Sequence, residues 1–100
     1  MSEIELSKWV EKWTKLVEEL RKGYDYYLEE YENARDVRAL IQRGIAGASP
    51  TTLKIIADAD HQFMELTYVD QGRQARPGEW WDNRLPLNPG HALRQDLGLD

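Results

Sequence analysis

The N-terminal segment places seven apolar residues along one side of a helix, with charged or polar residues between them. These residues are Leu6, Trp9, Val10, Trp13, Leu16, Val17 and Leu20. At roughly 100° per residue they span an arc of about 120°, which is typical of a helix with one packed face and one wet face. A single helix of this kind cannot bury two tryptophans, because burial needs an opposing apolar surface. The segment therefore has to pack against other elements of the chain or against another protein.

The first helix is predicted at about residues 3–22. Ser2, with Glu5 three residues later, matches a capping box at the start of this helix. Gly23 is a suitable C-terminal stop, and the basic residues directly before it complement the negative end of a helix.

Residues 25–46 are predicted as a second helical region, whose continuity is left open. Tyr24, Tyr27 and Tyr31 share one helical face. A short strand in this tyrosine-rich stretch is the weaker alternative, because an isolated strand would have no partner there. Asn33 has the chemistry of an N-cap, so the region forms either two helices that break near residue 33 or one bent helix.

A third helix is predicted at residues 50–69, and it begins at the clearest boundary in the chain. Ser49 is a good N-cap, and Pro50 fits the first helical position. The apolar residues of this segment cover more than half of its circumference, so we expect it to be the central helix. Residues 70–88 contain repeated glycines and prolines and are predicted to be irregular, and a short helix is predicted at residues 89–97.

Together these elements predict an all-α fold, a small bundle of about four helices in a single domain over residues 1–100. Trp80 and Trp81 lie in the irregular segment, which we expect to fold back over the helices as a latch loop. The core is expected to come mainly from the first and third helices, with Trp9 and Trp13 both buried.

Composition excludes several classes of protein. The chain has no cysteine, so disulfide scaffolds and cysteine-based zinc or iron–sulfur sites are excluded. The net charge is −5 and no basic stripe is present, which argues against a nucleic-acid partner. No apolar run approaches the roughly 18 residues of a membrane span, and the N-terminus lacks the pattern of a signal peptide. We therefore expect a cytoplasmic protein that binds neither nucleic acid nor a membrane.

The first candidate site is the pair Trp80 and Trp81, with Arg84 close by. Because Trp and Arg dominate the hot spots of protein interfaces, these residues could form a recognition surface. The favoured alternative is the latch, in which one ring closes the core and the other stays partly exposed. In that case replacing the buried ring by alanine costs on the order of 2–4 kcal/mol of stability. A stacking site for a small molecule is a third alternative.

The second candidate site is the cluster of Tyr24, Tyr27 and Tyr31, which lies among acidic residues. Such rings could grip a basic peptide or a ligand cation. The alternative is that the bodies of the rings pack inward and their hydroxyl groups remain in water.

Asp60 is a candidate buried polar residue, because it falls inside the apolar arc of residues 50–69. A buried carboxylate needs a partner or it becomes protonated. Arg38, Arg43, Arg84, a tyrosine hydroxyl or a tryptophan indole N–H could serve. We expect a structural hydrogen-bond network here, and an acid–base role is the alternative.

No catalytic residue, metal site or cofactor is predicted. Asp58, His61 and Glu65 share a helical face, but that face lies toward the polar side of the helix. A metal site in a bundle needs inward-pointing ligands from several helices. The chain also lacks a phosphate-binding loop and a nucleophile elbow.

These observations favour a small binding protein, an adaptor, inhibitor or immunity-type module whose partner is another protein or a second copy of itself. The alternatives are a small-molecule-binding bundle or minor enzyme built around Asp60 and the aromatic residues, and a self-associating structural protein.

Overall fold

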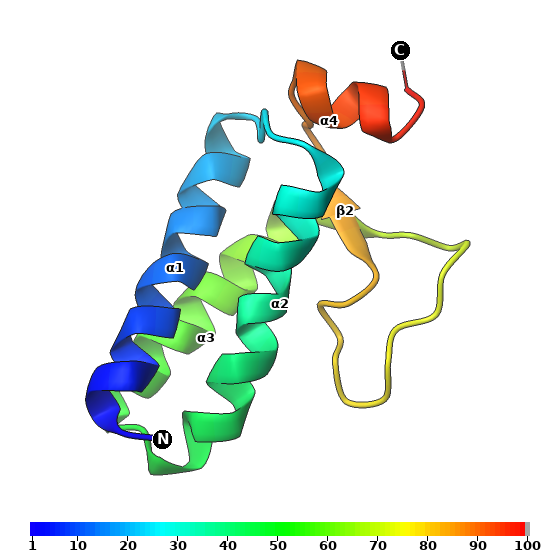
Figure 1. Ribbon diagram of the computed structural model, residues 1–100. Helices are drawn as coiled ribbons and strands as arrows, with labels where there is room; N and C mark the ends of the chain where they lie inside the picture. Colours follow the sequence, from blue (N-terminus) through cyan, green and yellow to red (C-terminus); the bar gives the residue numbers. More distant parts are fainter. Residues whose placement is uncertain (100) are drawn as a thin grey trace.

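The computed structural model describes residues 1–99 and shows three long helices, a small two-stranded sheet and a short fourth helix (Figure 1). In chain order the elements are α1 (Glu3–Lys22), α2 (Leu28–Gly44), a 3-10 turn (Ile45–Gly47), α3 (Pro50–Glu65), β1 (Thr67–Val69), β2 (Arg84–Pro86) and α4 (His91–Asp96). The mostly helical architecture agrees with the predicted fold class, whereas the sheet departs from an all-α fold. Within residues 1–99 no helix is both long and apolar enough to cross a membrane.

Helix α1 is the central element of the core. The Ser2 hydroxyl accepts a hydrogen bond from the Glu5 N–H at 3.1 Å, and Gly23 ends the helix with a positive φ of 92°. Six of its side chains are buried: Leu6, Val10, Trp13, Leu16, Val17 and Leu20. Trp9 is only half-buried, so one of the two indoles expected in the core is partly exposed.

Helix α3 is less central than predicted. Only Ile56, Ala59 and Phe63 of this helix are buried. The large apolar side chains of Leu53, Ile55 and Met64 are exposed. Part of the broad apolar arc of α3 is therefore exposed rather than packed in the core. The expectation that α3 is the central helix was wrong.

The first turns of α2 and α4 are each capped by a carboxylate from a distant part of the chain: Asp96 of α4 caps α2, and Asp25, in the connection between α1 and α2, caps α4. In the first turn of α2, the Leu28 N–H donates a hydrogen bond to the Asp96 carboxylate of α4 at 2.9 Å. In the first turn of α4, the Ala92 N–H donates to the Asp25 carboxylate at 2.9 Å. Each carboxylate thus accepts a hydrogen bond from a first-turn N–H group that has no carbonyl partner within its helix.

The predicted boundaries of these two helices need correction. Helix α2 is one continuous helix that starts at Leu28 rather than at residue 25, and Asn33 lies exposed in its interior instead of capping a separate segment. Helix α4 spans His91–Asp96 rather than residues 89–97, and its N-cap position is Gly90. In both places the capping group comes from a distant segment, which local spacing does not reveal.

Residues 67–69 form a strand and not the last turn of α3 as predicted. Strand β1 pairs antiparallel with β2, with Thr67 opposite Pro86 and Val69 opposite Arg84. Thr, Tyr and Val favour strands, because branched and aromatic side chains pack well on a pleated surface. The partner strand β2 lies within residues 70–88, which were predicted to be irregular. Without a predicted partner, residues 67–69 were assigned to the helix.

The latch loop, defined here as residues 70–83 between the strands, folds back onto the helices. Trp81 is only 1% exposed, while Trp80 is half-buried. The Trp80 ring lies 6.0 Å from Phe63 of α3, and Phe63 lies 4.7 Å from Trp13 of α1, measured between ring centroids. The aromatic contacts therefore run continuously from α1 through α3 into the loop.

Candidate partner-binding groove

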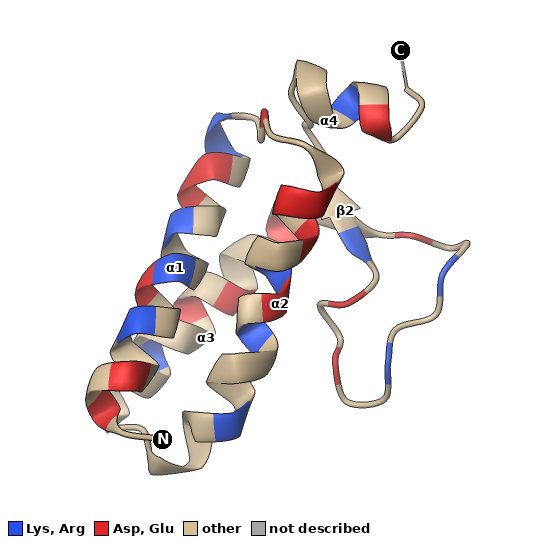
Figure 2. Cartoon of the chain, in the orientation of Figure 1, with Lys and Arg blue, Asp and Glu red and all other residues tan. Residues whose placement is uncertain are grey.

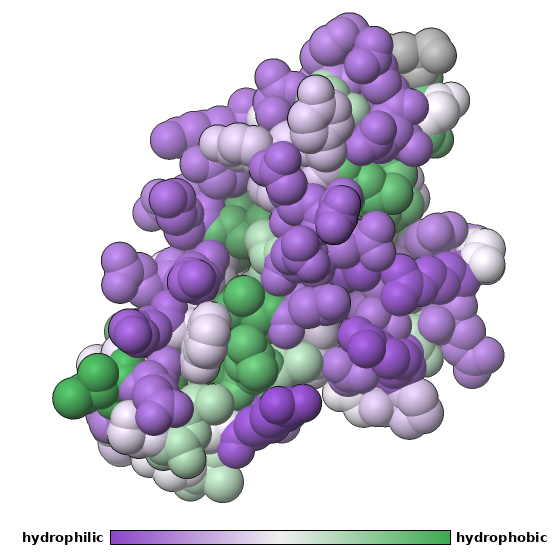
Figure 3. All heavy atoms as spheres, in the orientation of Figure 1, coloured by the Kyte–Doolittle hydropathy of each residue, from purple (hydrophilic) through white to green (hydrophobic). Residues whose placement is uncertain are grey.

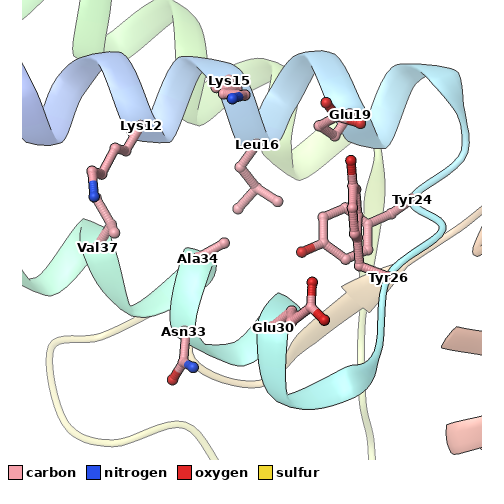
Figure 4. A pocket seen from close by; sticks show the side chains of 10 residues that line it. All are labelled: Lys12, Lys15, Leu16, Glu19, Tyr24, Tyr26, Glu30, Asn33, Ala34 and Val37. Atoms are coloured by element: carbon pink, nitrogen blue, oxygen red, sulfur yellow. The ribbon is translucent and has the colours of Figure 1, made fainter.

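A groove of about 500 Å³ runs between α1 and α2. Helix α3 lies behind these two helices in the view of Figure 1, and the groove is on the face turned toward the viewer. Ten residues line it: Lys12, Lys15, Leu16, Glu19, Tyr24, Tyr26, Glu30, Asn33, Ala34 and Val37 (Figure 4). We name this feature the α1–α2 groove.

The floor of the α1–α2 groove is apolar. Leu16 contributes from α1, and Ala34 and Val37 contribute from successive turns of α2. In Figure 3 hydrophobic atoms gather between the two helices, with hydrophilic atoms on both sides. Because the side chain of Ala34 is a single methyl group, the floor is lower there than a larger residue would make it.

The two ends of the groove carry opposite charges. Lys12 lies toward one end and extends toward Val37 across the groove, and Lys15 lies nearer the middle, beside Leu16 (Figure 4). Glu19 lies toward the other end, where Glu30 points at the tyrosine rings (Figure 4). The acidic first turn of α2, to which Glu30 belongs, is visible in Figure 2. Glu19 is seven positions after Lys12 in the helix, which is about 10 Å along the axis.

Two tyrosines form the acidic end of the groove. Tyr24 is buried and meets Tyr26 edge-on, with ring centroids 5.1 Å apart. Burial, and secondarily the negative charge of Glu30, raises the pKa of the Tyr24 hydroxyl to about 12. Tyr26 is 44% exposed and supplies the rim. Tyr24 was among the predicted partner-binding residues, whereas Tyr26, the lysines and the glutamates were not.

Tyr31 and Tyr27, the other predicted tyrosines, lie outside the groove. Tyr31 is fully buried, and its hydroxyl donates a hydrogen bond to the Arg84 carbonyl at 2.6 Å. Burial raises the pKa of this hydroxyl above its ordinary value. Tyr27 is exposed at the N-cap position of α2. The structure thus corrects the placement of Tyr31, whose ring and hydroxyl both belong to the interior.

Most of the predicted site at Trp80, Trp81 and Arg84 makes contacts within the protein itself. Trp81 is enclosed in the core, and only Trp80 retains some exposed surface. The Arg84 guanidinium donates to the carbonyls of Met64 and Thr67 at 3.1 and 3.3 Å, at the C-terminal end of α3. A cation is favourable at that end of a helix. Arg84 therefore stabilises the junction of α3 and β1.

Asp60 joins three helices. Both of its carboxylate oxygens accept hydrogen bonds from Arg38 of α2 at 2.8 Å, and one also accepts from the Trp13 indole N–H of α1 at 2.9 Å. The Asp60 side chain is 17% exposed. Two of the hydrogen-bond donors expected from the sequence, Arg38 and a tryptophan indole N–H, thus bind the Asp60 carboxylate together.

Asp82 is a buried carboxylate that the sequence analysis did not single out. It is 1% exposed and accepts hydrogen bonds from the Arg76 backbone N–H at 3.1 Å and from the guanidinium groups of Arg76 and Arg73 at 3.0 and 3.1 Å. Burial alone raises the pKa of this carboxyl, but these hydrogen bonds and positive charges outweigh it and hold the pKa below its ordinary value. Its position beside the tryptophan pair was the one signal that could have drawn attention to it.

The polar face of α3 carries two local side-chain contacts. His61 lies 2.6 Å from Glu65, and Lys54 lies 3.2 Å from Asp58, with all four side chains exposed. Across residues 1–99 no group of three or more His, Asp or Glu side chains is arranged to hold a metal ion.

Comparison with known proteins identifies no family. No protein-family model matches the chain, and neither does any curated protein or solved structure.

Proposed function

We propose that the protein is a small protein-binding module, of the adaptor, inhibitor or immunity type, that receives a segment of another protein in the α1–α2 groove. The observation that carries this proposal is the apolar floor that α1 and α2 leave uncovered between charged rims. Covering apolar surface is favourable by about 25 cal/mol per Å². A groove between two helices is also one of the recurring ways in which proteins bind peptide segments.

The rim supports the same proposal. Charged groups around an apolar contact steer association and select partners more than they add affinity. We place this activity in the cytoplasm, since a chain without cysteine needs no oxidising compartment. Asp60, on which a ligand-binding or enzymatic alternative depends, already has both oxygens bound by Arg38.

A pair of matched variants tests the proposal. Ala34→Trp fills the floor of the groove, and Ala57→Trp adds the same side chain to an exposed position of α3. Proteins captured from an extract of the cells that make this chain should bind to the wild type and Ala57→Trp but not to Ala34→Trp. Capture of the same proteins by all three would contradict a role for the groove.

Sedimentation of the three purified proteins distinguishes self-association from binding to another protein. We expect the wild type to remain monomeric as its concentration rises. A concentration-dependent assembly that Ala34→Trp abolishes would assign the groove to a second copy of the chain.

A further inference from the structure

We infer that helix α4 is a clamp that holds the acidic end of the α1–α2 groove in its binding shape, so that docking of α4 and occupation of the groove strengthen each other. This role of α4 rests on the proposed function and adds a regulatory element to the same site. The link between the two is the connection between α1 and α2, residues 23–27, which carries both groove tyrosines.

The connection, residues 23–27, forms neither helix nor strand, so its shape depends on what it contacts. The Tyr24 carbonyl accepts a hydrogen bond from the Gly90 N–H at 2.6 Å. The Asp25 carboxylate accepts one from the Ala92 N–H at 2.9 Å, and Asp25 leaves no room for a side chain at Gly90. Figure 1 shows α4 beside this connection at the end of the bundle. The start of α4 thus fixes two consecutive residues of the connection.

The C-terminal end of α4 holds the start of α2. The Asp96 carboxylate accepts a hydrogen bond from the Leu28 N–H at 2.9 Å. Glu30, which lines the acidic end of the groove, follows Leu28 by only two residues in the same helical turn. Both ends of α4 therefore contact the segment that carries the groove residues.

Tyr24 and Tyr26 carry these contacts into the groove. The Tyr24 carbonyl is bound by the residue that precedes α4, while its ring lines the groove. That ring also meets Tyr31 of α2 edge-on at 5.4 Å, which anchors it in the bundle. Tyr26 instead is exposed at the rim and meets the Tyr24 ring at 5.1 Å (Figure 4). The position of Tyr26 therefore depends on the backbone of the connection, and through it on α4.

Helix α4 is the element best suited to undock while the bundle stays folded. Of its six residues only Leu93 is buried. A helix this short is not stable in water by itself, and weakly anchored elements open locally at a lower cost than the whole fold. An occupant that contacts Tyr26 where docked α4 places it binds the docked state more tightly. By linkage, its binding then favours docking.

Asp96→Ala tests the clamp, and Gln95→Ala is its matched control. Both residues are exposed on α4 and neither lines the groove. Because Asp96→Ala removes a hydrogen bond to a charged group, amide exchange at Ala92 should become at least about fivefold faster. The nuclear Overhauser effect between the Tyr24 and Tyr26 rings should weaken as well. Gln95→Ala should change neither, and protected amides inside α1 and α2 establish that each variant is folded.

Tyr26→Ala tests the coupling in the reverse direction, with Tyr27→Ala as its control. Tyr26 borders the groove, whereas Tyr27 is exposed outside it. Because the contact between the Tyr24 and Tyr26 rings belongs to the docked state, its loss should speed amide exchange at Ala92. Tyr27→Ala should leave that exchange unchanged.

A peptide selected on the wild type from a displayed library, and not bound by Ala34→Trp, is the probe of the groove. It should bind Asp96→Ala at least about fivefold more weakly than the wild type, which is the lower end of typical couplings. It should also slow amide exchange at Ala92 in the wild type. Leu93→Ala, which removes the buried side chain of α4, is the stronger variant if exchange stays slow in Asp96→Ala.

The outcomes separate the clamp from the proposed function. Faster exchange at Ala92 with an unchanged ring contact and unchanged peptide affinity would overturn the clamp and leave the groove as a binding site. If no peptide distinguishes the wild type from Ala34→Trp, the proposed function fails. The ring contact in Asp96→Ala and the exchange in Tyr26→Ala then still decide whether α4 shapes the connection.

Discussion

The guanidinium of Arg38 lies 5.0 Å from the centre of the Trp81 ring while it binds both oxygens of Asp60. Asp60 in turn accepts the indole N–H of Trp13. One arginine on α2 therefore connects α3, α1 and the latch loop. Because these segments are far apart in the chain, each contact depends on the others being in place.

Replacing Asp60 tests the importance of this junction. In Asp60→Ala the Arg38 side chain, which is 5% exposed, loses its carboxylate partner. A buried charge without a partner is costly, so we expect the free energy of unfolding to fall by about 3 kcal/mol in urea denaturation. Asp58→Ala is the matched control, because Asp58 is exposed and forms its ion pair with Lys54 of the same helix. The control should change stability by about 0.5 kcal/mol or less. Equal losses would argue against the junction.

The two tryptophans of the latch loop should differ in their contribution to stability. Trp81 is enclosed and Trp80 is half-buried. We expect Trp81→Ala to lower the free energy of unfolding by about 3–4 kcal/mol, and Trp80→Ala by less than half of that. Thermal and urea denaturation measure both. If Trp80→Ala proves the more damaging change, the loop does not close the core in the way described here.

Gly90 is a position where a single methyl group should disturb the docking of α4. A Cβ atom at Gly90 would lie 2.7 Å from the Asp25 Cα, a backbone atom that cannot move aside cheaply. Gly90→Ala should lower stability by about 1–3 kcal/mol and speed amide exchange at Leu28 and Ala92. Gly47→Ala is the control, since a Cβ there meets nothing within 4 Å. Unchanged amide protection in Gly90→Ala would show that α4 tolerates the added methyl.

The stability of the latch loop should depend on pH through Asp82. Its pKa in the folded protein lies below the ordinary value of 3.8, so its stabilising effect is present above that value and is lost as the pH falls below it. Asp82→Asn should therefore be less stable than the wild type at pH 7, and the difference should shrink in acid. Urea denaturation at several pH values between 7 and 2 measures this. A constant difference across that range would mean that the charge of Asp82 contributes nothing.

Some local features of the fold could be read directly from the sequence. The capping interaction of Ser2 with Glu5 and the start of α3 after Ser49 both form as the spacing predicts. These signals are reliable because donor and acceptor lie within one turn of each other. The end of α3 was misplaced because Thr67 belongs to a strand that pairs with a remote segment. Thr67 lies opposite Pro86, and its hydroxyl accepts a hydrogen bond from Arg84, which is 17 residues away.

The sequence by itself determined where helices form, because the period of apolar residues and the capping residues act within a few positions of the chain. Tertiary structure alone decided which carboxylates cap α2 and α4, which tryptophan is enclosed and which charges border the α1–α2 groove. Those features depend on distances between segments that are remote in sequence. Lys12 and Glu30, for example, come to border a single surface only because α1 and α2 pack side by side.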